Sequence, residues 1–216
     1  MADTRKYIQA AIKYTVPGII LIGVMSLNLF AADVSTYSFN SGMNCNGVWR
    51  LPDTGQTNSY TTTFGEDHNY QPAAVQPSFT IYNPVGISSV TVDNRTGLMW
   101  ITNPKTDAGF AGQQTWESAL TSCTVTMNGG FGYANYTDWR LPNVRELMSI
   151  VDYGAADAPR INTTAFPGTL SNYYWTSTTY VPDTAGAWSV SFNTGNVVDV
   201  FKTVSAYVRC VRAGPY

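Results

Sequence analysis

The stretch "NYTDWRLPNVRELMSIVDY", residues 135–153, carries the clearest local structural signal in the chain. Asn143 is a favourable N-cap, and Glu146 stands at the position that completes a capping box. Pro142 keeps the residue before it extended. The stretch therefore predicts a turn that leads directly into a short helix. Four apolar residues repeat at i, i+3, i+4 and i+7, the spacing of one helix face: Val144, Leu147, Met148 and Val151.

Trp139 and Arg140 stand in the turn before this helix, and two interpretations of them are open. As a binding site, the Trp139 ring would be a stacking platform and the Arg140 guanidinium a hydrogen-bonding fork for a sugar. As a structural turn, Trp139 would pack under the helix start and Arg140 would pair with a carboxylate or a carbonyl. We favour the structural interpretation, because "DWRLP" runs straight into a capped helix.

The segments before this turn predict a hairpin and a first helix. In "VTVDNRTGLMW", residues 90–100, apolar runs flank a turn in which Gly97 supplies a positive φ. In "TWESALTSCTVTM", residues 115–127, Thr115 is the candidate N-cap. The predicted buried face of this helix consists of Trp116, Ala119, Leu120, Cys123 and Met127.

The last third of the chain predicts antiparallel strands. The candidate strands are "YYWTSTTY", "AWSVSF", "VVDVFK" and "AYVRCVR", with turns at residues 182–186 and 193–196. In the last of them Val208 and Cys210 would point to one side, and Arg209 and Val211 to the other. A hairpin, two helices and a terminal antiparallel sheet make an α+β fold.

The N-terminus predicts export. Residues 1–32 combine a basic start, an uncharged apolar run and small residues near Ala31 or Ala32, as a secretory leader does. The alternative is an uncleaved membrane anchor. Residues 33–85 are rich in Thr, Ser, Asn, Gly and Pro, and we interpret them as an extension of short strands and loops. Residues 86–216 are predicted to form the main domain. Because of the predicted leader, we expect the protein to be secreted or on the cell surface.

Composition excludes several classes of function. Only 12% of the residues are charged, about half the share of an ordinary soluble domain. Removing residues 1–32, which carry a net charge of +2, changes the net charge from −2 to −4. Lys and Arg form no dense run, which argues against nucleic acid or heparin-like polyanions as partners. His68 is the single histidine. A metal site with several histidine ligands is therefore excluded, and a catalytic triad could use only this residue.

The chain has three cysteines, Cys45, Cys123 and Cys210. In an oxidising compartment two of them should pair. Cys123 on the first helix is available to pair with Cys210 on the last strand. In the chain-entropy model, a disulfide that closes this loop would stabilise the folded state by roughly 4–5 kcal/mol. Cys45 would then be free, buried or linked to a second chain.

The motifs together resemble the Lcl C-terminal domain family, over residues 88–214. The resemblance implies a C-type-lectin-like fold, related to the fold of the formylglycine-generating enzyme, in an exported protein that is often an adhesin. "LPDTGQT", residues 51–57, also resembles a segment found upstream in such proteins. The family's best-known member binds glycosaminoglycans, but the acidic balance here argues against polyanion binding. The motifs that carry the resemblance are "TVDNRTGLMW", "TWESAL", "YTDWRLPNVRELMSIVDY", "YYWTSTTY", "AWSVSFNTG" and "YVRCVRAG".

The resemblance also suggests where a ligand would bind, because loops of the terminal sheet commonly form the binding face of lectin-like folds. The candidate ligand-binding residues are Tyr180, Asp183, Asn193, Asn196 and Lys202. The alternative is that these loops are ordinary solvated turns. A calcium site, which needs six to eight oxygen ligands, has four candidates that are near one another in sequence: Asp138, Asp152, Asp157 and Asn162.

Three functions follow as hypotheses. The first is an exported, non-enzymatic surface binding protein of the adhesin type, with a glycan or a surface protein as its partner. The second is a structural subunit of a surface filament or sheath, which self-associates through residues 33–85 or Cys45. The third is an enzyme of the formylglycine-generating superfamily, which would require reactive thiols at Cys123 or Cys210.

Overall fold

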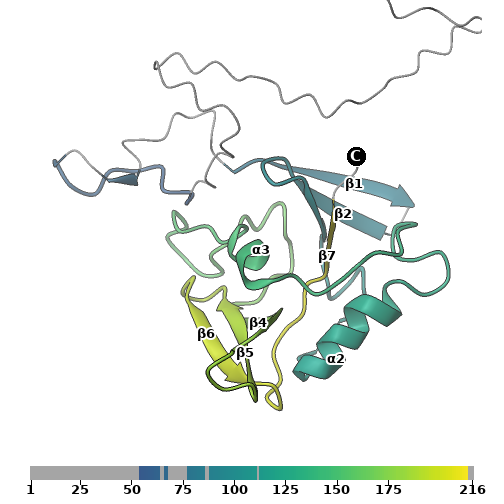
Figure 1. Ribbon diagram of the computed structural model, residues 1–216. Helices are drawn as coiled ribbons and strands as arrows, with labels where there is room; N and C mark the ends of the chain where they lie inside the picture. Colours follow the sequence, from purple (N-terminus) through teal and green to yellow (C-terminus); the bar gives the residue numbers. More distant parts are fainter. Residues whose placement is uncertain (1–53, 64–65, 68–76, 86–87, 111, 214–216) are drawn as a thin grey trace, which may run out of the picture. The chain divides into compact units, whose positions relative to one another are not determined.

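The computed structural model describes residues 54–63, 66–67, 77–85, 88–110 and 112–213 (Figure 1). The predicted leader, Cys45 and much of the predicted extension lie outside the described residues. Within the described ranges, no helix is long and apolar enough to cross a membrane. Short helices and two antiparallel sheets confirm the α+β class.

The first sheet has four antiparallel strands in the order β1-β2-β3-β7. They are β1 (Phe79–Val85), β2 (Ser88–Asp93), β3 (Leu98–Ile101) and β7 (Val211–Ala213). The predicted hairpin is confirmed, and Gly97 has a φ of +70° in its turn. β1 lies within residues 33–85 and pairs with β2, so the sheet begins before residue 86.

The second sheet contains β4 (Tyr173–Thr179), β5 (Gly186–Ser191) and β6 (Val197–Phe201) in sequence order. The prediction that "AYVRCVR" belongs to this terminal sheet is wrong for its final residues, which form β7 beside β3. The segment crosses between the sheets: Tyr207 bridges Tyr174 of β4, whereas β7 pairs with the first sheet. The alternation of side chains along a strand shows which face is buried, but it cannot show which of two strands, both distant in sequence, is its neighbour.

The helices are short. α2 (Trp116–Thr121) continues into the π-helical turn η2 (Ser122–Thr126), and α3 spans Val144–Met148. The predicted capping box of α3 is confirmed, with reciprocal bonds between Asn143 and Glu146. Met148, predicted on the buried face, is 37% exposed. The helix ends at this residue, so the chain leaves the helical path and Ile150 is buried instead.

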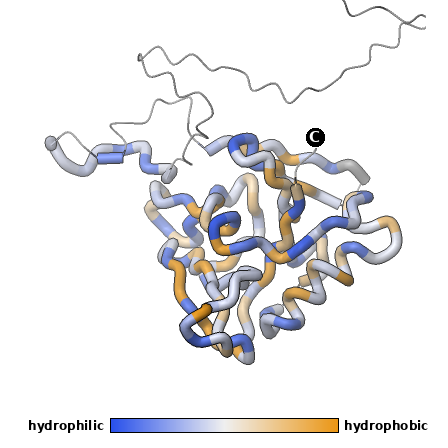
Figure 2. Tube along the Cα trace, viewed as in Figure 1, coloured by the Kyte–Doolittle hydropathy of each residue, from blue (hydrophilic) through white to orange (hydrophobic). Residues whose placement is uncertain are grey.

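Two apolar clusters form the core, one on each face of the first sheet. Met99 and Ile101 join the cluster that contains residues of α2, whereas Trp100 between them joins the cluster with Leu147 of α3. α3 lies between the two sheets (Figure 1), because Leu147 also shares its cluster with Val190 of β5. Figure 2 shows apolar residues along the strands and alternating apolar and hydrophilic residues along α2. Both faces of the first sheet are therefore covered at β2 and β3, whereas Ile81 and Tyr82 on the edge strand β1 are exposed.

The predicted disulfide between Cys123 and Cys210 is present, with a Cα–Cα distance of 5.5 Å. Both cysteines are fully buried in the cluster on the α2 side. The bond joins η2 to the segment that leads into β7. It therefore ties the first helix to the last part of the fold.

Candidate binding surfaces

The turn before α3 is held by hydrogen bonds from the preceding loop. Trp139 is 1% exposed, and its Nε1 donates to the carbonyl of Tyr133 at 2.9 Å. The Asn128 side chain accepts from the backbone N–H of Trp139 at 2.8 Å and donates to its carbonyl at 2.9 Å. Trp139 therefore has a structural role, and its ring offers no face to a ligand.

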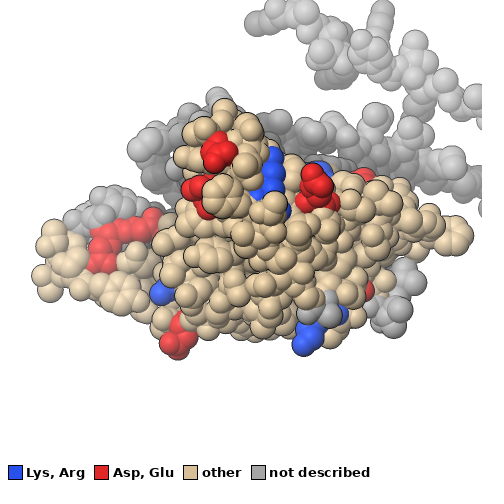
Figure 3. Space-filling model, turned by 90° about the horizontal axis from the view of Figure 1, so that it is seen from below, with Lys and Arg blue, Asp and Glu red and all other residues tan. Residues whose placement is uncertain are grey.

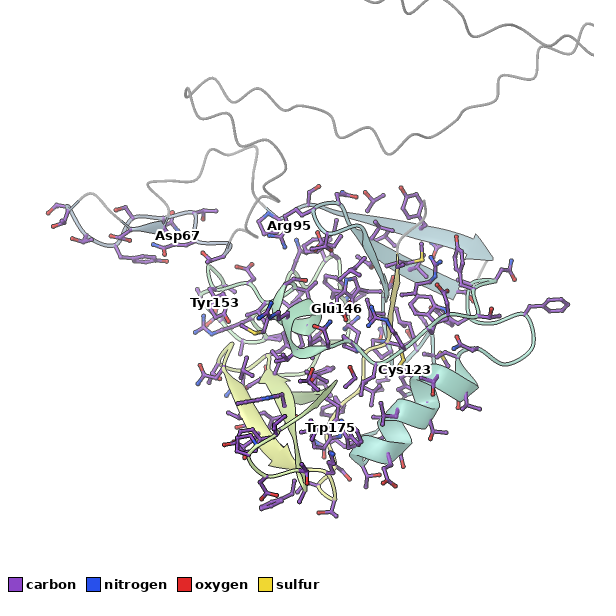
Figure 4. The ribbon with its side chains drawn as sticks, in the orientation of Figure 1. Asp67, Arg95, Cys123, Glu146, Tyr153 and Trp175 are labelled. Carbon is purple, nitrogen blue, oxygen red and sulfur yellow. A yellow bond between two sulfur atoms is a disulfide. The ribbon has the colours of Figure 1, made fainter. Side chains whose placement is uncertain are left out.

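Arg140 makes a bidentate ion pair with Glu146, with N–O distances of 2.7 and 2.6 Å. Burial raises the pKa of Glu146, but bonds from Arg140 and the Asn143 backbone, with the Arg140 charge, outweigh it and lower that pKa below its ordinary value. Hydrogen bonding to Glu146 raises the pKa of Arg140 in turn. The guanidinium thus binds the capping carboxylate of α3 (Figure 4, Glu146).

The structure separates the five predicted ligand-binding residues into two groups. Asn193 and Asn196 lie in the turn between β5 and β6 and are exposed. Tyr180, Asp183 and Lys202 lie at the opposite end of β5, next to the turn that precedes it. These five residues therefore do not form one site.

Lys202 is the centre of the second group. Its Nζ donates to Thr179 Oγ1 and to the carbonyl of Thr184, both at 3.0 Å. It also lies 4.2 Å from the ring centroid of Trp116, in cation–π geometry. The indole Nε1 of Trp116 donates to the carbonyl of Thr176 at 2.8 Å. Lys202 thus joins α2 to the second sheet, in addition to any role toward a ligand.

Tyr180 and Asp183 shape the same end of the sheet. The Tyr180 ring packs edge-on against Trp188, with centroids 5.0 Å apart, and Asp183 Oδ1 accepts from the backbone of Ala185. Val181 and Phe201 nearby are 80% and 61% exposed. Figure 3 shows a face of the molecule that is mostly uncharged, with few charged side chains, some of which lie close together. Aromatic and apolar side chains among few charges can contact a neutral ligand.

A cavity that sequence analysis did not predict lies between the upstream segment and the chain after α3. Its volume is about 220 Å³. The backbone N–H of Tyr153 donates to the carbonyl of Thr54 at 2.7 Å, which holds the two segments together. Figure 4 labels two residues of this region, Arg95 in the turn after β2 and Tyr153 after α3. The cavity lining includes Gly55, Thr57, Phe79, Arg95, Asp152 and Asn162.

Comparison with known families decides the family of this fold. The model of the Lcl C-terminal domain matches residues 89–212, which is more than half of the chain. The chain belongs to the Lcl C-terminal domain family. The match spans β2 to β7, including both cysteines of the disulfide and the capped turn before α3. A search of curated proteins finds no match to the chain.

In this Lcl C-terminal domain, the four calcium candidates are not gathered at one point. Asp138 pairs with Arg212, with N–O distances of 2.6 and 3.2 Å. Asp152 and Asn162 both line the cavity described above. Among the described residues, no group of three or more His, Cys, Asp or Glu side chains could hold a metal ion. Two of the four candidates therefore share a cavity, whereas Asp138 is engaged in an ion pair with Arg212.

Proposed function

We propose that this chain is an exported, non-enzymatic binding protein of the bacterial cell surface, with an adhesin-like role. Membership in the Lcl C-terminal domain family over residues 89–212 is the observation that carries the proposal. We further propose that the two sheets and two helices form a C-type-lectin-like scaffold. A glycan or a surface protein is the proposed ligand.

Three properties of the described structure support this role. The buried disulfide suits a protein that folds in an oxidising compartment. The end of the second sheet presents the partly exposed rings of Tyr180 and Trp188, and the partly exposed ring of Trp116 of α2 lies under Lys202. The thiols that the enzyme alternative would need, at Cys123 and Cys210, are joined to each other.

The test is binding of residues 33–216 to an array of glycans and to a panel of host-matrix proteins, with calcium and then with EDTA. Selective binding to a glycan or protein supports the proposal. Binding that is lost in EDTA would show that the interaction requires calcium. Binding that is kept in EDTA would indicate that aromatic and amide side chains make the contacts. Failure to bind any member of either panel would overturn the proposal.

A second candidate function is self-assembly into a filament or sheath, and one exposed side chain favours it. Phe131 is 90% exposed on the loop between η2 and α3, and no residue from 118 to 137 is charged. An exposed aromatic ring on a neutral loop could insert into a neighbouring copy without charge repulsion. Sedimentation velocity over a wide concentration range tests this. Concentration-dependent association that Phe131→Ser abolishes would support it, and a strict monomer would exclude it.

A further inference from the structure

We propose that the cavity between residues 54–57 and the chain after α3 binds one neutral ring of a polyhydroxylated ligand, such as a sugar. This inference rests on the proposed binding function and gives it a site and a ligand class. The cavity lining contains none of the five ligand-binding residues that sequence analysis expected, although the turn between β5 and β6 contacts the chain after α3 through the bond from the Tyr153 hydroxyl to the Gly195 carbonyl. Four features of the cavity carry it.

The first feature is the close backbone contact between residues 54–57, which form one wall of the cavity, and the chain after α3. Gly55 has a φ of +87°, a backbone conformation that favours glycine. A Cβ atom on Gly55 would overlap with the carboxylate of Asp152, and one on Gly154 would overlap with the carbonyl of Gly55. Glycine at both positions therefore lets the upstream segment lie directly against the chain after α3. The cavity exists because of this contact.

The second feature is a pair of complementary polar side chains. Asp152 Oδ1 accepts from the backbone N–H of Gly154 at 2.8 Å, and no described residue donates to its Oδ2. Asn162 Oδ1 accepts from the backbone of Ala165 at 2.9 Å, and its amide nitrogen donates to no described residue. The cavity thus offers one acceptor and one donor, each fixed by a backbone bond. Because sugar hydroxyls both donate and accept, they can satisfy both.

The third feature is the charge of the lining. Arg95 bonds to the carbonyl of Ser149 at 2.9 Å and forms an ion pair with the buried Asp93. Its guanidinium is therefore engaged by the protein, while Asp152 contributes negative charge to the cavity. An anionic ligand would meet the Asp152 carboxylate at close range, which disfavours acids and phosphates. A neutral ligand avoids this repulsion.

The fourth feature is size and apolar surface. At about 220 Å³ the cavity is smaller than the roughly 300–1,000 Å³ of sites for drug-sized ligands. Phe79 and Ile150 supply apolar lining beside the polar pair. A single sugar ring also combines apolar and polar surface, with C–H groups on its faces and hydroxyls on its edge. The site therefore fits the terminal or exposed residue of a glycan better than an extended chain.

Saturation-transfer NMR on the full exported chain tests the site, with six free sugars as probes: glucose, galactose, mannose, fucose, N-acetylglucosamine and N-acetylgalactosamine. Asp152→Asn keeps the acceptor for Gly154 and removes the charge. Asn162→Asp keeps the acceptor for Ala165 and replaces the free donor with an acceptor. For at least one sugar, we expect either variant to weaken binding tenfold or more.

Two matched controls separate this site from other parts of the surface. Asp183→Asn alters a carboxylate that also accepts from a backbone N–H two residues ahead, and Asn83→Asp makes the same charge change on an exposed residue of β1. We expect both controls to bind within twofold of the unmodified protein. Loss of binding in the controls but not in Asp152→Asn or Asn162→Asp would overturn the inference, as would absence of a signal from all six sugars. Selective capture of a glycan or protein on the panels described above would still support the broader binding function.

Discussion

The backbone of Gly154 lies so close to the carbonyl of Gly55 that a side chain on Gly154 would overlap with it, and a side chain on Gly55 would overlap with the Asp152 carboxylate. The two residues are about a hundred positions apart in the sequence. Their contact, together with the bond from Tyr153 to Thr54, makes the upstream segment part of the domain surface. The cavity beside them therefore depends on two glycines that carry no chemistry of their own.

Gly154→Ala should release the upstream segment without unfolding the domain. The new Cβ would overlap with the Gly55 carbonyl, and the bond between Thr54 and Tyr153 would be lost. We expect the Tyr153 amide to exchange with solvent at least about tenfold faster, because it loses its acceptor. Hydrogen exchange with mass spectrometry measures this. Gly112→Ala is the control, since its Cβ would meet no atom within 4 Å, and equal protection in both variants would contradict the prediction.

Sequence reasoning predicted the elements whose signals are local. The cap of Asn143 and Glu146 is contained in four residues, and the hairpin turn at Gly97 is contained in five, so neither depends on distant contacts. Strand β7 was assigned to the wrong sheet, because its partner β3 lies more than a hundred residues earlier. Short-range patterns give the face that a strand buries, but the neighbour is chosen by packing of the whole chain.

Removing the disulfide should lower the free energy of unfolding by about 2–5 kcal/mol. The Cys123→Ala/Cys210→Ala double variant tests this in urea unfolding, because the two cysteines are separated by 87 positions and are fully buried. A reducing agent should lower the stability of the unmodified protein and leave the double variant unchanged. Equal stability of the reduced and oxidised proteins would contradict the prediction that the disulfide stabilises the folded state.

Asn143→Ala should destabilise the domain by about 0.5–2 kcal/mol, the usual cost of losing an N-cap side chain. The Asn143 side chain accepts from the backbone N–H of Glu146 at 2.9 Å, and alanine leaves that donor unpaired. Asn143→Ser should recover most of the stability, since a hydroxyl can cap as well. Thermal unfolding of the three proteins is the measurement, and equal behaviour of the alanine and serine variants would rule out a capping role.

The ion pair of Arg140 and Glu146 should make stability depend on pH in the acid range. The folded state lowers the pKa of Glu146 below its ordinary value of 4.5, so folding favours the ionised carboxylate. Its contribution is therefore present above about pH 4.5 and is lost as the pH falls through the lower, folded-state pKa. Glu146→Gln keeps the cap geometry and removes this titration.

Urea unfolding from about pH 7 to about pH 3 checks this prediction. The unmodified protein should exceed Glu146→Gln in stability near neutral pH, and the difference should shrink as the pH falls below about 4.5. Because Arg140 is partly exposed, the difference at neutral pH should be modest. A constant difference across the whole range would show that the charge of Glu146 makes no contribution.

Arg209→Met should destabilise the fold by about 3 kcal/mol or more, because it leaves several buried acceptors unpaired. The Arg209 guanidinium is fully buried and donates to the carbonyls of Ile101 and Thr102 and to Thr169 Oγ1. Burial lowers the pKa of Arg209 to about 10, against the opposing effects of Tyr174 and Asp107. Arg145→Met on the exposed face of α3 is the control and should change stability little in urea unfolding. Comparable losses in the two variants would contradict a central role for Arg209.

The site was harder to predict than the fold, and the reason is visible in Asp152 and Asn162. Both were singled out from their proximity in sequence as calcium ligands, and the structure does bring both to one cavity. Residues 149–151 beside Asp152 also line the cavity, but the remaining lining comes from residues 55, 57 and 77, β1 and the turn after β2, which no local pattern connects to them. The wall itself is a contact between two glycines, and their spacing in sequence carries no signal of it.

The bond between Cys123 and Cys210 has a mechanical consequence. α3 and the whole second sheet lie between the two cysteines, so tension applied to the ends of the chain bypasses them through the disulfide. The shielded segment would otherwise add about 300 Å of extensible length. Under such tension the domain would extend only through residues outside the disulfide-closed loop, which include β1, β2, β3 and α2, and the segment that carries β4 to β6 would bear no load.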